Sequence, residues 1–230
     1  MPVLHSLLDA FTHPRTTDPA SPSLTMPRRL SVPVGYGDFG LRPVELDDAD
    51  EWNAVRWGNK EWLAPWESGD PLGGSPLTFN EWVASLRRNE TAGSSAVFVM
   101  EFQTAIVGQI SLGAICYGAM RTATVGYWVD KDHVGHGFAP LAVALLADWA
   151  FFDPSGPRLH RIEIDVLPSN QRSLRVAQKL GMNQEGIKRG YMFIGGQWRD
   201  HLSFSLLANE CQEGVLKEFL EKNRDTPRIT

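Results

Sequence analysis

Tyr-Trp-Val-Asp-Lys-Asp-His-Val-Gly-His-Gly-Phe-Ala, residues 127–139, is the stretch from which the fold can be worked out. It reads as the end of a strand and a turn with glycines at 135 and 137, followed by an apolar stretch over residues 140–152 that is typical of a buried helix. Glycine lets such a turn bend tightly and point successive N–H groups at one anion, and the helix adds the positive end of its dipole. The stretch therefore predicts a pyrophosphate-binding turn, although an ordinary strand-to-helix turn would look the same.

The spacing of these glycines excludes the two common nucleotide-binding loops. A Walker loop has the pattern Gly-x4-Gly-Lys-Ser/Thr, and a Rossmann fingerprint has a third glycine and an acidic residue about 20 positions later. Neither pattern is present around residue 135.

The segments on either side of this turn predict a mixed sheet. Before it, three runs rich in β-branched and aromatic residues favour an antiparallel meander. After it, residues 161–167 alternate apolar and acidic side chains and follow a helix, as the second strand of a parallel βαβ unit would. The meander strands are expected over residues 96–102, 106–115 and 122–129.

Capping signals predict the positions of the helices. Thr78-x-x-Glu81 is a capping box for a helix that runs to about residue 89. Asp47 and Asp48 are candidate N-caps for an earlier helix, which Gly58-Asn59 should end. The other expected elements are a strand over 39–44, a loop over 65–76, a helix from Asn170 to Gly181, and strands over 186–194 and 197–207 around a Gly195-Gly196 hairpin turn.

The chain divides into three expected parts. Residues 1–33 carry prolines at positions 2, 14, 19, 22, 27 and 33 among polar residues, so we expect a poorly ordered tail. Residues 34–208 hold the patterned segments and form the folded domain, and residues 209–230 form a C-terminal helix or tail.

Composition indicates one α/β domain in the cytoplasm. The 230 residues are 43% hydrophobic and 21% charged, and the two cysteines form neither a ligand pattern nor a disulfide framework. No apolar stretch reaches the ~18 residues that cross a bilayer, so we expect no membrane partner. The net charge of -5 argues against direct nucleic-acid binding. A homodimer is compatible with the sequence, which leaves the oligomeric state open.

The early tryptophans cannot all face one core. Trp52, Trp57 and Trp62 step by five, and each step rotates a helical residue by about 140°. We therefore expect at least one of them to point elsewhere, either because Gly58-Asn59 breaks the helix or because Trp62 and Trp66 line a groove for an acceptor.

Several ordered segments resemble the GNAT superfamily of acyl-CoA-dependent N-acyltransferases, and in particular its RimJ/RimL branch of ribosomal-protein N-terminal acetyltransferases. The resemblance covers about residues 36–208. Its matching stretches are Gly135-x-Gly137-x-Ala139, Leu63-Ala-Pro-Trp-Glu67, Gly126-Tyr-Trp-Val129, His160-Arg-Ile-Glu163, Leu167-Pro-Ser-Asn-Gln-Arg-Ser173 and Gly195-Gly-Gln-Trp-Arg-Asp-His201.

The resemblance implies an α/β GNAT fold, with a mixed, mostly antiparallel central sheet, a splayed parallel strand pair and flanking helices. It implies acetyl-CoA as cosubstrate, with the pantetheine arm along the first splayed strand and the pyrophosphate on the glycine turn. Val134 departs from the Gln or Arg that the family often has there. The implied CoA-binding residues are Tyr127, Trp128, Val129, Val134, Gly135, His136, Gly137, Phe138, Ala139, Asn170 and Ser173.

The implied chemistry is direct attack of a neutral amine on the thioester, without a covalent enzyme intermediate. By resemblance, Asn170 orders the CoA arm and the Ser173 hydroxyl donates a proton to the departing sulfur. Both residues also suit the start of a helix, so a purely structural role stays open. No metal is expected, because His133 and His136 lack a third ligand spaced near them.

The proton acceptor is harder to assign. Some RimL-like proteins use a glutamate near the penultimate hairpin as the base. Met192 occupies the corresponding position in this chain, so Glu67 is the best replacement for that base. The alternative for Glu67 is a solvated loop carboxylate. Trp66, Glu67 and Asp200 are the expected substrate-binding residues; His201 stands behind Asp200 as a further candidate base, and Glu163 and Asp165 are further candidates for the channel wall.

Together these features predict transfer of acetyl from acetyl-CoA to a primary amine, with the N-terminal amine of a protein such as a ribosomal protein as the favoured acceptor. A small amine is the second candidate. A GNAT domain that binds CoA or a protein without turnover is the third, favoured by Val134 and by the missing carboxylate at Met192.

Overall fold

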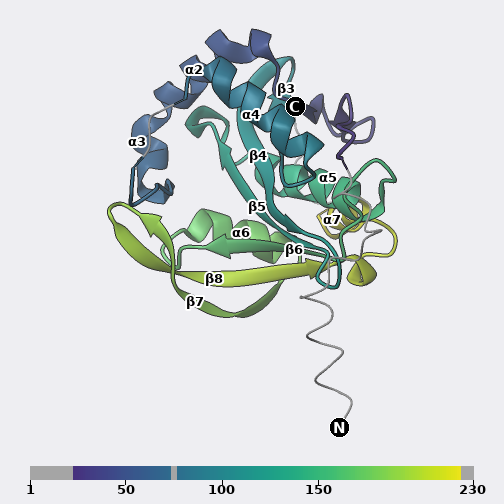
Figure 1. The fold of residues 1–230 in the computed structure, drawn as a ribbon. Helices are drawn as coiled ribbons and strands as arrows, with labels where there is room; N and C mark the ends of the chain where they lie inside the picture. The colour runs from purple at the N-terminus through teal and green to yellow at the C-terminus, as the bar shows by residue number, and fades with distance from the viewer. Residues whose placement is uncertain (1–22, 74–76, 224–230) are drawn as a thin grey trace, which may run out of the picture.

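Residues 23–73 and 77–223, which the computed structural model describes, contain one eight-stranded sheet (Figure 1). Its neighbouring strands are antiparallel except for β5 and β6, as the mixed-sheet prediction required. In sheet order the strands are β1 (Leu30–Ser31), β2 (Phe39–Pro43), β3 (Ala96–Phe102), β4 (Ala105–Cys116), β5 (Thr122–Val129), β6 (Arg161–Val166), β8 (Gln197–Leu207) and β7 (Asn183–Ile194).

Helices cover both faces of this sheet. The side chains of α2 (Ala49–Gly58) and α4 (Phe79–Thr91) pack on one face, and the short α3 (Lys60–Leu63) continues from α2. On the other face lie α5 (Phe138–Phe152), α6 (Gln171–Lys179) and α7 (Val215–Lys222). No helix in the described ranges is long and apolar enough to cross a membrane. The 3₁₀ turns are Leu46–Asp48, Ala64–Trp66, Lys131–His133 and Ala208–Glu210.

Strand alternation builds a separate apolar core on each face. On β3, Phe98 and Met100 point toward α5, whereas Val97 and Val99 join Val83 and Leu86 of α4. Side chains alternate across a strand, so the two cores follow directly from the period-two pattern. The α5 core is the larger one because α5 is buried almost all round, as its uninterrupted apolar sequence predicts.

The parallel pair β5 and β6 separates soon after it forms. Only Thr122, Ala123 and Thr124 pair with β6, opposite Arg161, Ile162 and Glu163. From residue 125 to residue 129, β5 has no sheet partner on that side among the described residues. Its edge N–H and C=O groups are therefore available to another molecule. This splay is the feature that positions the site.

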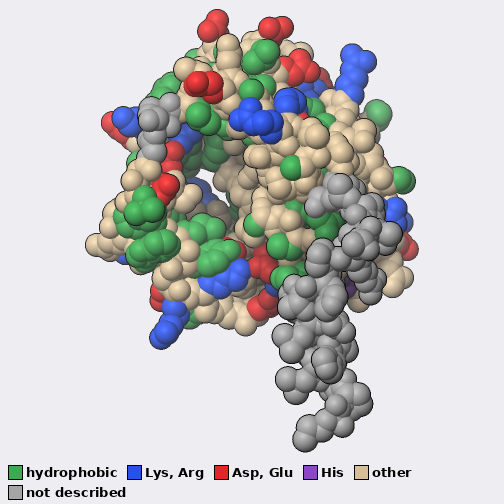
Figure 2. Space-filling model, in the orientation of Figure 1, with side chains coloured by type: hydrophobic (Ala, Val, Ile, Leu, Met, Phe, Trp, Pro, Cys, Tyr) green, Lys and Arg blue, Asp and Glu red, His purple; other side chains and the backbone are tan. Residues whose placement is uncertain are grey.

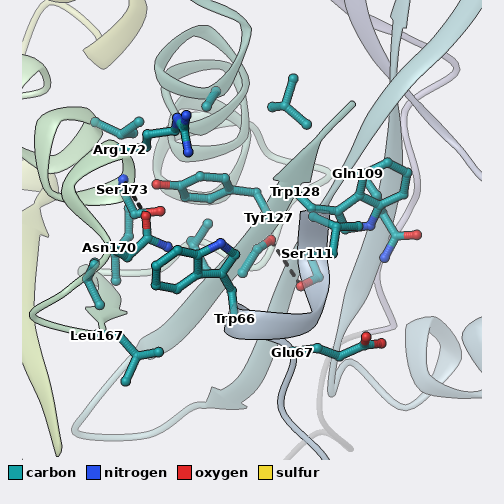
Figure 3. A pocket seen from close by; sticks show the side chains of 18 of the residues that line it. Trp66, Glu67, Gln109, Ser111, Tyr127, Trp128, Leu167, Asn170, Arg172 and Ser173 are labelled. Atoms are coloured by element: carbon teal, nitrogen blue, oxygen red, sulfur yellow. Dashed lines mark hydrogen bonds between the residues drawn. The ribbon is translucent and has the colours of Figure 1, made fainter. Parts of the chain in front are cut away.

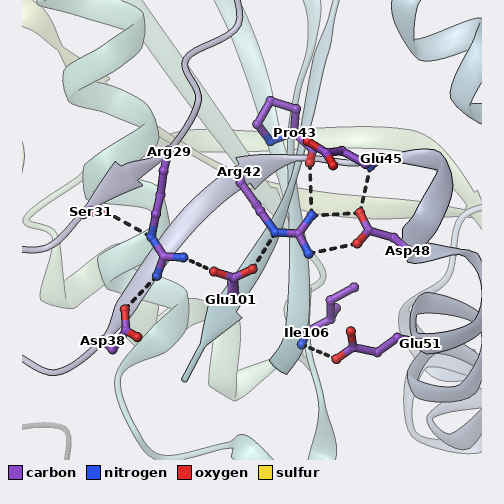
Figure 4. A network of polar contacts seen from close by, with 10 residues as sticks. All are labelled: Arg29, Ser31, Asp38, Arg42, Pro43, Glu45, Asp48, Glu51, Glu101 and Ile106. Carbon is purple, nitrogen blue, oxygen red and sulfur yellow. Dashed lines mark hydrogen bonds and ion pairs between the residues drawn. The ribbon is translucent and has the colours of Figure 1, made fainter. Parts of the chain in front are cut away.

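Most element boundaries agree with the sequence. The capping box forms between Thr78 and Glu81, α2 ends at Gly58, and α5 and α6 lie within two residues of their expected starts. The Asp48 side chain does not make the expected N-cap hydrogen bond. Its side chain caps no helical N–H of α2 but accepts two hydrogen bonds of 2.8 Å from Arg42 and one of 2.7 Å from the backbone N–H of Glu45 (Figure 4).

The packed domain begins before residue 34. Residues 1–22 of the expected tail lie outside the described residues, but Leu24 and Val32 are buried in the α5 core and β1 pairs with β2. Arg29 forms ion pairs with Asp38 and with Glu101 of β3 (Figure 4). The last part of the expected tail therefore packs on the sheet. At the other end, α7 supplies the expected helix, and residues 224–230 lie outside the described ranges.

Candidate active site

A cavity of about 880 Å³ opens where β5 and β6 separate. Its walls come from both faces of the sheet. Ser173 and Val176 of α6 line it on the α5 side, whereas Ser111, Thr124 and Asp165 line it on the α4 side. The cavity therefore runs through the sheet at the splay. Figure 2 shows the surface deeply hollowed beside α3, in the region of the separated strands.

The glycine turn borders the cavity at the start of α5. Gly135 and Gly137 have φ angles of +88° and +83°, in the left-handed region that residues with a Cβ seldom adopt. A Cβ at either position would meet nothing within 4 Å, so the space above the turn is open. Gly137 is the N-cap of α5, and the first N–H groups of a helix are unsatisfied by the helix itself. The turn thus suits an anion.

A buried polar network holds the segment that leads into this turn. Asn59, with only 1% of its surface exposed, donates to Asp130 at 2.6 Å and accepts from the N–H of Lys131 at 2.8 Å. Asp130 also contacts His133 Nδ1 at 2.6 Å. Burial raises the pKa of Asp130, but the hydrogen bonds from Asn59 and His133 outweigh burial and leave it below its ordinary value. The sequence indicated Asn59 only as a helix end, so this support was missed.

Asn170, Ser173 and Tyr127 form the next part of the same wall (Figure 3). Asn170 Oδ1 accepts a hydrogen bond of 3.1 Å from the N–H of Ser173, so Asn170 caps α6 as well as lining the cavity. The ring of Tyr127 points toward Ser173 (Figure 3). Burial raises the pKa of Tyr127 to about 12, and the Ser173 hydroxyl acts weakly in the opposite direction. The phenol is therefore neutral at physiological pH.

Trp66 and Glu67 enter the cavity from the segment that follows α3. They point in opposite directions, Trp66 toward Asn170 and Glu67 away from it (Figure 3). The Glu67 side chain is 51% exposed and forms an ion pair with Arg56. The Arg56 guanidinium lies 5.9 Å from the ring centroid of Trp128, the neighbour of Tyr127 whose side chain points to the opposite face.

Three of the early tryptophans line the cavity and one does not. Trp52, Trp62 and Trp66 are on its wall, whereas Trp57 is 62% exposed outside it. This confirms that the three tryptophans spaced by five residues do not share one face. Trp62 also faces Arg172 of α6, with 4.3 Å between the guanidinium carbon and the ring centroid.

The cavity gathers most of the residues expected at the site, including Glu67, Trp66 and all but one of the CoA-binding set. His136 is the exception. It is exposed, and its ring stacks on Phe138 with centroids 5.5 Å apart. Val134 lines the cavity and is 37% exposed. Among the described residues, no cluster of three or more His, Cys, Asp or Glu is placed to hold a metal ion.

The candidate residues on β6 and β8 do not all line the cavity. Asp200 does not line the cavity, and its carboxylate accepts a hydrogen bond of 2.7 Å from the N–H of Gly190 in the neighbouring strand. Because side chains alternate along β8, His201 faces inward and is buried in the cavity wall. Of the two acidic residues on β6, Asp165 lines the cavity and Glu163 does not.

Comparison with known proteins identifies similar chains. The family model described as an acetyltransferase (GNAT) domain matches residues 38–183. The Bacillus subtilis protein YjcK, named a probable N-acetyltransferase, is 33% identical over 172 residues, which cover 73% of this chain and 92% of YjcK. The Escherichia coli [ribosomal protein uS5]-alanine N-acetyltransferase is 26% identical, over 74% of this chain and 88% of its own length.

Solved structures give the same result. The structure of Mycobacterium smegmatis RimJ in complex with a CoA disulfide has a TM-score of 0.76 and 32% sequence identity. The match covers 85% of this chain and 93% of that one. The Vibrio fischeri ribosomal-protein-S5-alanine acetyltransferase has a TM-score of 0.68 and 26% identity, over 78% of this chain and 97% of that one.

Proposed function

The chain belongs to the GNAT acetyltransferase family and is an N-acetyltransferase, and from this premise we propose that it acetylates the N-terminal α-amine of a protein. The acceptor class is suggested by relatives that act on ribosomal proteins. The observation that carries the proposal is the cavity through the sheet. One of its ends has a glycine turn suited to a pyrophosphate, and the other end lies between α3 and β7, where a polypeptide can extend outward.

On this proposal acetyl-CoA binds along the free edge of β5 between residues 125 and 129. The turn from Val134 to Ala139 would hold the pyrophosphate with its backbone N–H groups. The N–H of Val129 would polarise the thioester carbonyl, where negative charge develops as the amine attacks. These contacts use main chain, so the apolar Val134 removes a side-chain contact without removing a backbone donor.

The proton transfers are assigned to groups in the wall. The amine nitrogen forms a bond to the carbonyl carbon as the C–S bond breaks, and the amine loses one proton. We propose that Ser173 donates a proton to the departing thiolate and regains one from water, since Ser173 lies in the α6 wall beside the buried hydroxyl of Tyr127. Glu67 remains the proposed proton acceptor from sequence, but its carboxylate must first leave Arg56.

The protein is further proposed to act in the cytoplasm, where ribosomal proteins are made. A small amine is the second candidate acceptor. It is supported by the structural similarity to a chimeric spermidine N-acetyltransferase, which has a TM-score of 0.60 and 25% identity over 75% of this chain and 96% of that one.

Thiol release from acetyl-CoA tests these alternatives directly. We expect release with peptides that begin with Ala or Ser, and mass spectrometry should locate the acetyl group on the α-amine. The matched control is the same peptide with its N-terminus already acetylated and one internal lysine, which should be inert. Turnover of spermidine with inert peptides would replace the protein acceptor by a small amine.

A further inference from the structure

Asp165 is a buried carboxylate in the wall of the cavity. Along β6 the residues Ile162, Ile164 and Val166 point into the α5 core, so Glu163 and Asp165 point to the opposite face. The Asp165 side chain has 0% exposure, whereas that of Glu163 has 18%. Burial of a charged group is costly unless its hydrogen-bonding capacity is satisfied, so the partners of Asp165 matter.

Lys188 forms an ion pair with Asp165 but donates a hydrogen bond to only one of its oxygens. Its Nζ lies 3.0 Å from Oδ1 and 3.0 Å from Oδ2, and hydrogen-bond geometry is met at Oδ2. Oδ1 is buried and accepts no hydrogen bond from the described residues. Burial raises the pKa of the neighbouring Tyr191 phenol, and the charge of Asp165 and its contact with the phenol act in the same direction. The oxygen is therefore available to a donor that enters the cavity.

The surroundings of Asp165 carry an excess of negative charge. Lys188 also pairs with Glu163, and Arg161 pairs with Glu163 and Glu185. Two cations thus face three carboxylates, and the cluster keeps one uncompensated negative charge. The hydroxyl of Thr124 and the buried His201 also face this side of the cavity, and Ser111, Gln109 and the Arg56–Glu67 ion pair line it as well. A cationic donor fits this environment better than a neutral one.

The position of Asp165 in the sheet brings this oxygen to the reaction site. Glu163 pairs with Thr124 in the last register pair before β5 and β6 separate, and Asp165 is the next residue on the same face. It stands where the cavity passes through the sheet. The CoA turn and Ser173 approach this opening from the α5 side, so an acceptor must approach from the side of Asp165.

We propose that Asp165 is the residue that binds the acceptor amine, with Oδ1 accepting a hydrogen bond from an N–H of the amine. The proposal rests on the proposed function only in requiring a primary amine as acceptor. Lys188 fixes the carboxylate, and the excess negative charge attracts the ammonium form into the opening. Glu67 does not provide this site, because its carboxylate is half-exposed and forms an ion pair with Arg56.

Asp165→Asn tests the assignment with little change in shape. A hydrogen bond to a charged group contributes enough that its loss should raise the KM for an Ala-starting peptide about tenfold or more. The rise in Tm on adding acetyl-CoA should be unchanged. Glu101→Gln is the matched control, since it removes a buried, ion-paired carboxylate of β3 that lies outside the cavity and outside this charge cluster. Its peptide KM should stay within about twofold of wild type.

Calorimetry provides a second measurement that does not depend on turnover. CoA-loaded wild type should bind the free-amine peptide more tightly than the same peptide with an acetylated N-terminus, and Asp165→Asn should lose this preference. A preference retained in Asp165→Asn, absent from wild type, or lost equally in Glu101→Gln would overturn the assignment. If the preference is present but no peptide is acetylated, the proposed function fails and the amine site stands.

A second variant keeps the test possible if Asp165→Asn does not fold. If Asp165→Asn melts below the assay temperature, the double variant with Lys188→Gln removes the cation together with the carboxylate and takes its place. The free-amine preference is then measured in the double variant, which should lose it; a preference retained there would overturn the assignment.

Discussion

The two ends of the cavity are built in different ways. The end beside α5 and α6 uses backbone groups and short-range neighbours, namely the turn over residues 134–139 and the Asn170–Ser173 cap. The end beside α3 and β7 uses side chains from distant segments, such as Arg56, Asp165 and Lys188. Backbone sites tolerate changes of side chain, whereas side-chain sites do not. On the proposed function, the first end would bind the cosubstrate and the second would select the acceptor.

The largest expected effect comes from placing a side chain on the glycine turn. Gly137→Val forces a β-branched residue to a φ of +83° and puts methyl groups into the open space where an anion would lie. We expect the rise in Tm on adding acetyl-CoA to disappear, a loss of about 2.7 kcal/mol at a ligand concentration 100 times Kd. Differential scanning fluorimetry with and without acetyl-CoA measures it.

Gly118→Val separates backbone strain from ligand contact. Gly118 has a φ of +66° with nothing within 4 Å of an added Cβ, but it lies in the turn between β4 and β5, away from the cavity. Its variant should lower the basal Tm in the same way and keep the acetyl-CoA effect. Equal ligand effects in both valine variants would remove the turn from the site.

The second effect compares two serines that line the cavity on opposite faces of the sheet. Ser173→Ala should lower kcat about 10²-fold, the usual contribution of a general acid, while keeping the response to acetyl-CoA. The cap of α6 should survive, because Asn170 binds the backbone N–H of Ser173. Ser111→Ala removes a hydroxyl from the opposite wall, and its kcat should stay close to wild type. A similar loss in both variants would mean that neither serine has a specific role in proton transfer.

The same contrast explains how far the sequence could predict the molecule. The antiparallel meander of β3 to β5, the capping box at Thr78 and the turn at Gly135 depend on local periodicity and on backbone conformation, which are visible in a single sequence. The Asn59–Asp130 hydrogen bond joins residues 71 positions apart, and no local pattern indicates such a contact. Hence the support beneath the turn could not be predicted, although the turn itself could.

Side-chain direction on the later strands was only partly predictable. Alternation along β6 indicates that Asp165 and Glu163 share a face, but the splay decides that only Asp165 reaches the cavity. On β8 the sequence favoured Asp200, whereas the register turns His201 inward and leaves Asp200 with the N–H of Gly190. The choice depends on how two distant strands are aligned, which short motifs do not encode.

The third effect concerns the acceptor end. Trp66 lines the cavity from the segment after α3, and its ring can hold the first side chain of a peptide. Trp66→Ala should raise the peptide KM about tenfold, as the loss of an aromatic contact residue does, with little effect on Tm or on acetyl-CoA binding. Trp57→Ala is the control, because Trp57 is exposed outside the cavity. An unchanged KM in Trp66→Ala would place the peptide elsewhere.

The smallest effect tests whether the Tyr127 hydroxyl is shielded from water in the cavity wall. Burial raises its pKa to about 12 from the ordinary 10.0, so the folded protein favours the neutral phenol. As the pH rises above 10, the unfolded chain loses this proton first, and stability falls until the folded phenol ionises near 12. Between pH 9 and 11, Tyr127 should cost wild type about 1.4 kcal/mol in free energy of unfolding. Tyr127→Phe should remove that part of the slope in urea titrations.

The raised pKa of Cys211 adds a decline in the same range, but it is present in both proteins and cancels in the difference. Parallel curves for wild type and Tyr127→Phe would show that water reaches the phenol, and Tyr127 would then not be a shielded part of the wall beside Ser173.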